Sequence, residues 1–190
     1  MRRLIQTAFV LIGFAGLVPG SATAAMVDDA SKRAMFDADV HMALINLAVD
    51  VPGSQYVLNP AGATAALVFP EIGEGPFIAS DERGEGALVV PGKTLGYYKT
   101  GGLPLGLRGA SSETHSMIVV FRTLEALQRF QNSGAWDLGG DASVEIVHAS
   151  AGGEVEDSQL TKPVLVFVFT NRGLMGGLSL EGTKITTYTF

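Results

Sequence analysis

The chain contains no cysteine among its 190 residues. This absence excludes disulfide bonds, thiolate metal sites and cysteine nucleophiles, so the fold must be held together by its core alone. Basic residues are also scarce, since 13 Lys and Arg stand against 19 Asp and Glu. Because an acidic protein is repelled by the phosphates of nucleic acid, we expect no nucleic-acid partner.

The common catalytic motifs are missing as well. The three histidines, His41, His115 and His148, lie on three different expected elements and show no metal-binding spacing. The chain has no Gly-x-Ser-x-Gly elbow and no Walker-type phosphate loop. We therefore predict a protein that is not an enzyme and that uses no metal or cofactor. A hydrolase that unites Ser111, His115 and a distant carboxylate is the weakest alternative.

The first 24 residues have the organisation of a secretory signal peptide. Arg2 and Arg3 form a short cationic start, residues 4–18 are mostly apolar, and Ala22-Thr-Ala24 offers the small residues that a signal peptidase reads. The apolar run is shorter than the roughly 20 residues that a membrane span needs. We expect cleavage after Ala24 and export to the bacterial periplasm, where the protein is free or peripherally attached to a membrane.

The first periodic segment predicts a helix from about Asp28 to Asp50. Its apolar residues form two stripes, the first comprising Phe36, Val40, Ala43 and Leu47, and the second comprising Met35, Met42, Ile45 and Val49. A helix that packs on a protein surface needs only one apolar stripe. Two interpretations stay open: the helix is wedged between the body and a second element, or the second stripe meets lipid or a protein partner.

Period-two and β-branched patterns fill the rest of the chain and predict nine strands. These are residues 64–69, 77–80, 86–90, 94–99, 117–122, 143–148, 164–170, 173–180 and 184–188. Turns at Pro91-Gly92 and at 171–173 supply the fixed or positive φ that antiparallel hairpins need. Strands 117–122 and 164–170 are apolar on both faces, so both faces of the sheet must be covered.

One helix interrupts the predicted strands. Thr123 is placed to cap it, and Leu124, Leu127 and Phe130 are expected on its buried side. The sequence thus predicts an α+β fold that is mainly β. Its body is a strongly curved antiparallel sheet or a barrel, with an N-terminal helix and one helix inserted between strands.

Several short sequence motifs occur in a fixed order between residues 67 and 188. Residues 164–188 combine an apolar strand, an Asn-Arg-Gly turn, a glycine-studded strand and a Thr-Lys-Ile-Thr edge. Leu67-Val-Phe-Pro70, Gly84-Glu-Gly86 and Trp136-x-Leu-Gly139 precede them. Together these motifs resemble the SYLF domain, a lipid-binding module of eukaryotic trafficking proteins, yeast actin-patch proteins and bacterial envelope proteins. The resemblance implies one SYLF-like domain over residues 25–190.

The resemblance implies non-enzymatic binding of lipid, phospholipid or a membrane surface. The candidate lipid-binding residues are Lys32, Arg33, Met35, Met42, Ile45, Val49, Lys93, Lys99 and Arg108. In this hypothesis the N-terminal helix covers or enters the site, and Lys93, Lys99 and Arg108 supply local positive charge. The alternative is a structural or protein-interaction module of the envelope without a lipid ligand. Actin regulation, described for eukaryotic relatives, has no counterpart in a bacterial envelope and is not expected.

Two departures from the family pattern bear on the lipid. Residues 71–77 are acidic where family members commonly have a basic, glycine-rich loop, and Leu107 and Arg108 stand where the family has a glutamine turn. Phosphoinositide recognition is therefore not expected. Burial of acyl chains or insertion of the helix stripe is the expected source of binding energy.

Overall fold

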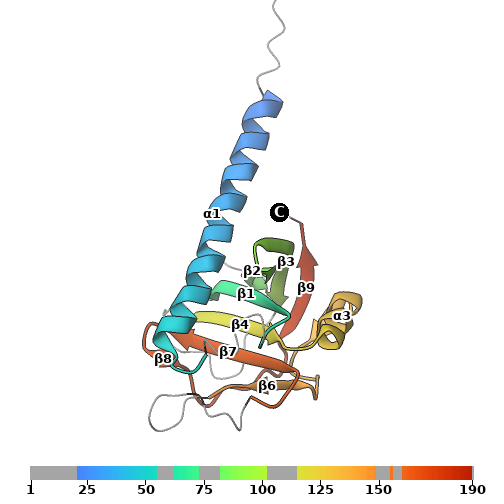
Figure 1. The fold of residues 1–190 in the computed structure, drawn as a ribbon. Helices are drawn as coiled ribbons and strands as arrows, with labels where there is room; N and C mark the ends of the chain where they lie inside the picture. The colour runs from blue at the N-terminus through green and yellow to red at the C-terminus, as the bar shows by residue number, and fades with distance from the viewer. Residues whose placement is uncertain are drawn as a thin grey trace, which may run out of the picture.

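The structure, a computed structural model, describes residues 21–54, 62–72, 82–101, 115–148, 155 and 160–189, with backbone alone for residues 21–28, 82 and 83. Within these residues lie two helices and a nine-stranded sheet (Figure 1). The elements are α1 (Ser21–Asp50), β1 (Ala65–Ile72), β2 (Glu82–Val90), β3 (Lys93–Gly101), β4 (His115–Phe121), α3 (Leu124–Asn132), β5 (Ala135–Asp137), β6 (Val144–Ile146), β7 (Val164–Thr170), β8 (Gly173–Leu174) and β9 (Lys184–Tyr188).

The strands form one strongly curled sheet. Their order is β5-β9-β3-β2-β1-β4-β7-β6, with β8 paired to β7, and all pairs are antiparallel except β6 with β7. Four strands separate β5 from β4, yet the Trp136 ring on β5 lies 5.8 Å from the Phe121 ring on β4. This contact requires the sheet to bend around its inner face, as in a half-barrel. The predicted fold class is confirmed.

A β-bulge bends the middle of this sheet. The register of β1 against β2 shifts between Val68 and Glu71, which leaves Pro70 at the irregular position. Proline has no N–H to give to a ladder, so a bulge accepts it where a regular central strand does not. Gly86 lies across from the bulge, where a Cβ would come within 2.5 Å of the Phe69 ring. The aromatic side chain therefore occupies the space that a larger residue would need.

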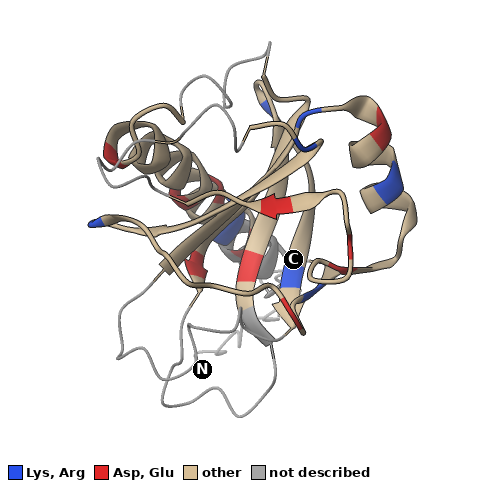
Figure 2. Cartoon of the chain, turned by 90° about the horizontal axis from the view of Figure 1, so that it is seen from below, with Lys and Arg blue, Asp and Glu red and all other residues tan. Residues whose placement is uncertain are grey.

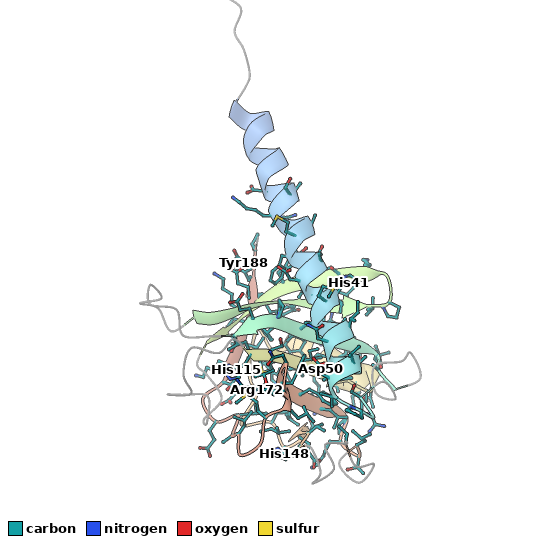
Figure 3. The ribbon with its side chains drawn as sticks, turned by 90° about the vertical axis from the view of Figure 1, so that its left-hand side faces the viewer. His41, Asp50, His115, His148, Arg172 and Tyr188 are labelled. Carbon is teal, nitrogen blue, oxygen red and sulfur yellow. The ribbon has the colours of Figure 1, made fainter. Side chains whose placement is uncertain are left out.

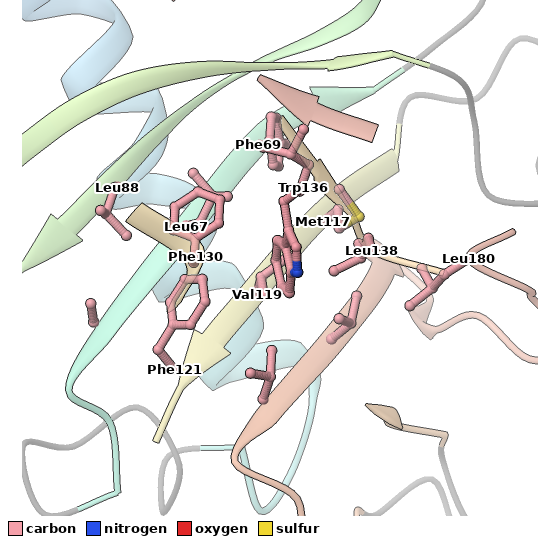
Figure 4. Packing of buried hydrophobic residues seen from close by; sticks show 14 of the residues in the cluster. Leu67, Phe69, Leu88, Met117, Val119, Phe121, Phe130, Trp136, Leu138 and Leu180 are labelled. Atoms are coloured by element: carbon pink, nitrogen blue, oxygen red, sulfur yellow. The ribbon is translucent and has the colours of Figure 1, made fainter. Parts of the chain in front are cut away.

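The inner face of the sheet is filled by α3 and by side chains from both ends of the sheet (Figure 4). The Phe130 ring of α3 lies 5.0 Å from Phe121 and 5.1 Å from Trp136. Thr123 caps α3 as predicted, because its Oγ1 accepts a hydrogen bond from the Ala126 N–H at 3.2 Å. These aromatic contacts pack the inner face of the half-barrel with apolar side chains.

One prediction for α3 is wrong. Leu127 and Phe130 are buried as expected, but Leu124 is 59% exposed and Ala126 takes the third buried position. Successive residues of an α-helix are rotated by about 100° around its axis. On this basis residues 126, 127 and 130 lie on one side of α3, and Leu124 is rotated by about 115° from the middle of that side. Its spacing of three from Leu127 was not enough to place it inside.

The outer face of the sheet is covered by α1. Val40, Ala43 and Leu47 are fully or almost fully buried against side chains of β1, β2, β4 and β7. The helix ends at Asp50 as predicted, but it starts at Ser21 instead of about Asp28. The extension is rich in alanine, the strongest helix former. Its N-terminal turns project beyond the sheet, and the predicted cleavage position falls within them (Figure 1).

The strand predictions differ from the structure in two further places. The strand expected over 173–180 is paired with β7 at Gly173–Leu174, and the Met175 N–H donates one further hydrogen bond to the Val168 carbonyl at 2.8 Å. Beyond it, Gly177 adopts a φ of +72°, which is not an extended conformation. The three-residue β5 was not predicted, since three residues are too few to show a period of two. The predicted strand 77–80 lies outside the described residues.

Candidate functional site

The second apolar stripe of α1 faces solvent. Met35, Met42, Ile45 and Val49 are 52–72% exposed, whereas Val40, Ala43 and Leu47 of the first stripe are at most 3% exposed. Figure 3 looks onto the molecule from the side of α1, which crosses in front of the sheet. Within the described part of the chain no second element covers this stripe, so the wedged-helix interpretation is wrong there. We call Met35, Ala38, Met42, Ile45 and Val49 the outer stripe.

Ala38 belongs to the outer stripe because it is exposed and lies on the same side of the helix. With it, the stripe runs through positions 35, 38, 42, 45 and 49, at alternating spacings of three and four. Such spacing produces a narrow apolar seam along a helix. The sequence analysis missed Ala38 because a small side chain adds little to a hydrophobic pattern. The regular spacing of three and four residues could have identified Ala38 as a member of the stripe.

A polar contact fixes the rotation of α1 on the sheet. The Asp37 carboxylate accepts hydrogen bonds from Thr94 Oγ1 at 3.3 Å and from the Tyr97 hydroxyl at 3.2 Å, both on β3. Next to it, the Phe36 ring lies 6.0 Å from the Tyr97 ring. Burial raises the pKa of Tyr97, the Asp37 carboxylate raises it further, and Arg33 acts in the opposite direction. Because this contact holds one side of α1 to β3, the outer stripe is turned away from the body.

The C-terminal end of α1 is fixed separately. The Ser54 hydroxyl is buried and donates a hydrogen bond to the Leu47 carbonyl at 2.9 Å. The Val51 N–H donates to the same carbonyl at 3.1 Å. Val155 reaches this turn from a distant part of the sequence, and its N–H donates to the Pro52 carbonyl at 3.2 Å. Three hydrogen bonds therefore hold the C-terminal end of α1 and the turn that follows it.

The candidate basic residues do not gather in one place. Lys93 is exposed at the first position of β3, and Lys99 lies six residues further along that strand, roughly 20 Å away. The Lys99 ammonium lies 3.9 Å from a Glu85 carboxylate oxygen and 4.0 Å from the centre of the Tyr188 ring. Arg108 lies outside the described residues. Figure 2 shows Lys and Arg dispersed over several elements among acidic residues.

Lys32 and Arg33, the two basic residues of α1, are both exposed and precede Met35 of the outer stripe. Arg33 lies one turn before Asp37, which contacts β3, so its position is on the sheet side of the helix, and its charge acts to lower the pKa of Tyr97. The structure thus unites Met35, Met42, Ile45 and Val49 on one surface and separates Arg33, Lys93 and Lys99 from it. The lipid-binding role of all these residues stays a prediction.

The hydrolase alternative gains no support from the described residues. His115 is buried at the start of β4, His41 is exposed on α1, and His148 follows β6 (Figure 3). Ser111 lies outside the described residues. Among the residues that are described, no three His, Asp or Glu side chains come together as metal ligands do. None of the helices in that same part of the chain is sufficiently long and apolar to cross a bilayer.

The motif Trp136-x-Leu-Gly139 has a structural role. The Trp136 indole N–H donates to the Asp141 carboxylate at 3.0 Å, and the Ser143 N–H and hydroxyl donate to the same group at 2.8 and 2.6 Å. Burial raises the pKa of Asp141, but these hydrogen bonds outweigh it, so the pKa lies below its ordinary value. A Cβ on Gly139 would lie 2.4 Å from the Leu180 carbonyl oxygen. The motif therefore orients Trp136 into the inner core.

Residues 96–189 match a protein family described as Ysc84, Las17-binding protein actin regulator. The matched region runs from β3 to β9 and includes the inner core motif, whereas α1, β1 and β2 precede it. No curated protein matches the chain.

Proposed function

Because residues 96–189 belong to the Ysc84 family, the SYLF family of the resemblance, we propose that this protein binds lipid at a membrane surface without catalysis. We place this activity in the periplasm, on the basis of the signal-like N-terminus. The observation that carries the proposal is the outer stripe of α1. It is an apolar surface that the chain leaves exposed and holds in a fixed direction by the contact of Asp37 with β3.

The energy available from the outer stripe suits peripheral attachment. Complete burial of a large apolar side chain is worth about 1.5–3 kcal/mol. The four larger side chains of the stripe are 52–72% exposed, so insertion into the acyl boundary would add at least about 1 kcal/mol each, or at least about 4 kcal/mol in total. This gain supports weak and reversible binding of one molecule to a bilayer.

The spacing of the outer stripe favours a second candidate function. Alternating spacings of three and four are also the pattern with which one helix packs against another. Helices that lie in a membrane interface more often have a broader apolar face and a basic polar face. In this second candidate, a helix of another envelope protein packs along the outer stripe, and no lipid is bound.

Vesicle flotation separates the two candidates. The purified protein is mixed with phosphatidylcholine vesicles and centrifuged, and native mass spectrometry searches the purified protein for bound lipid. We expect the wild-type protein to float with the vesicles. Met42→Asp combined with Ile45→Asp should abolish flotation while leaving the thermal unfolding midpoint almost unchanged, since both side chains are exposed.

A matched control is available on the other helix. Leu124 is an exposed apolar residue of α3, and Leu124→Asp adds the same carboxylate at a distance from the outer stripe. This variant should float like the wild-type protein. If the wild-type protein neither floats nor carries lipid, the lipid proposal is wrong and the helix-packing candidate takes its place.

A further inference from the structure

The charges around the outer stripe restrict the kind of membrane that it can enter. Residues 35–49 contain Asp37 and Asp39 and no Lys or Arg. Asp39 is exposed and lies one turn from both Met35 and Met42, at the border of the stripe. Any bilayer that buries these methionines therefore brings its headgroups close to the Asp39 carboxylate.

The basic residues near the stripe do not reverse this balance. Over residues 29–50, whose side chains are described, Asp29, Asp37, Asp39 and Asp50 stand against Lys32 and Arg33, which leaves a net charge of −2. Arg33 lies one turn before Asp37, on the side of the helix that faces the sheet, and Lys32 lies one turn before Met35.

From these observations we infer that the outer stripe binds electrically neutral, zwitterionic bilayers and that anionic lipid weakens the binding. This inference rests on the proposed function and specifies its ligand. The apolar contact supplies the attraction, and it does not depend on headgroup charge. The net negative charge of residues 29–50, with Asp39 at the border of the stripe, supplies a repulsion that grows with the negative charge of the surface.

The expected size of the effect follows from the charge count. One elementary charge close to an anionic membrane changes the partition coefficient about five-fold, which corresponds to about 1 kcal/mol. The segment of residues 29–50, with its excess of two negative charges, should therefore bind strongly anionic vesicles about 30-fold more weakly than neutral ones at low salt. High salt should reduce this difference, because the Debye length falls to about 3 Å at 1 M.

The test compares flotation of the purified protein on pure phosphatidylcholine vesicles and on vesicles that also contain phosphatidylglycerol, at low and high salt. We expect strong flotation on the neutral vesicles and weak flotation on the anionic vesicles at low salt. Asp39→Lys should leave binding to neutral vesicles unchanged and raise binding to anionic vesicles about 30-fold, since it alters the charge by two units. The control Glu181→Lys makes the same change of charge in an exposed turn after the inner-core residue Leu180 and should have little effect.

The outcomes distinguish this inference from the function on which it rests. Equal or stronger flotation on anionic vesicles overturns the inference and leaves lipid binding intact. Absence of flotation on every vesicle overturns both and points to a protein partner for the outer stripe. An increase with Glu181→Lys as large as that with Asp39→Lys also overturns the inference, because the effect would then come from the overall charge of the protein.

Discussion

The two apolar stripes of α1 are similar in composition and opposite in environment. Val40 and Leu47 on the inner side are fully buried, whereas Met35 and Val49 on the outer side are 70% and 72% exposed. Both stripes lie on one helix and are built from side chains of similar hydrophobicity. The difference is that one meets a complementary sheet surface and the other meets solvent. Apolar spacing in a sequence therefore identifies a surface that can be buried, without naming what buries it.

The complementary surface explains which stripe is buried. Small residues of the sheet, Ala66 on β1 and Ala87 on β2, belong to the same cluster as Val40, Ala43 and Leu47. Small side chains allow the helix backbone to come close to the sheet, and larger residues such as Phe167 on β7 belong to the same cluster. The outer stripe has no such counterpart among the described residues.

The largest expected effect comes from truncating equivalent positions of the two stripes. Leu47→Ala should lower the free energy of unfolding by about 2–5 kcal/mol, because it leaves a cavity between α1 and the sheet. Val49→Ala should change it by less than about 0.5 kcal/mol, because its side chain is already exposed. Urea unfolding measures both. Equal losses would show that the outer stripe is covered in solution, and the comparison would fail.

A smaller effect is expected at the contact that orients the helix. Tyr97→Phe and Asp37→Asn each weaken the hydrogen bond between α1 and β3 and should each cost about 1 kcal/mol. Since both changes affect the same bond, the double variant should cost clearly less than the sum of the two. Additive losses in urea unfolding would mean that Asp37 and Tyr97 act independently and that another contact sets the rotation of α1.

The smallest expected effect is a dependence on alkaline pH. The pKa of Tyr97 in the folded protein is raised above its ordinary value of 10.0, by burial first and then by Asp37. The contribution of this group to stability is complete below the unfolded pKa and is lost as the pH rises through the folded pKa. Wild-type stability should therefore fall above about pH 10.

The matched variant for the pH measurement is Tyr97→Phe. It should lose less stability than the wild type between about pH 8 and about pH 11 in urea unfolding. Some loss should persist in the variant, because burial also raises the pKa of Tyr98. An identical pH dependence in both proteins would contradict the assignment to Tyr97.

Much of the fold could be predicted because local patterns carried it. The alternation of strands, the turn at Pro91-Gly92, the cap at Thr123 and the end of α1 at Asp50 were all confirmed. The errors arose where a residue depends on distant partners. Leu124 has a helical spacing that suits the core, but the inner cluster around Phe130 leaves it outside.

The candidate site was predictable only in part. The sequence identified four of the five residues of the outer stripe, because they recur at helical spacing. It did not predict the contact of Asp37 with Thr94 and Tyr97, since those residues lie more than fifty positions away. It also grouped Lys93 with Lys99, but these two residues lie far apart along β3. Lys99 is moreover paired with Glu85.

By itself, the sequence determined the class of fold, the absence of thiol chemistry and the presence of two apolar stripes on one helix, because these depend on composition and on spacing along the chain. Only the tertiary structure decided which stripe is buried, that the sheet curls far enough for Trp136 to reach Phe121, and which charges border the exposed surface. The physical reason is that burial and electrostatic environment belong to pairs of surfaces, and folding alone brings such surfaces together.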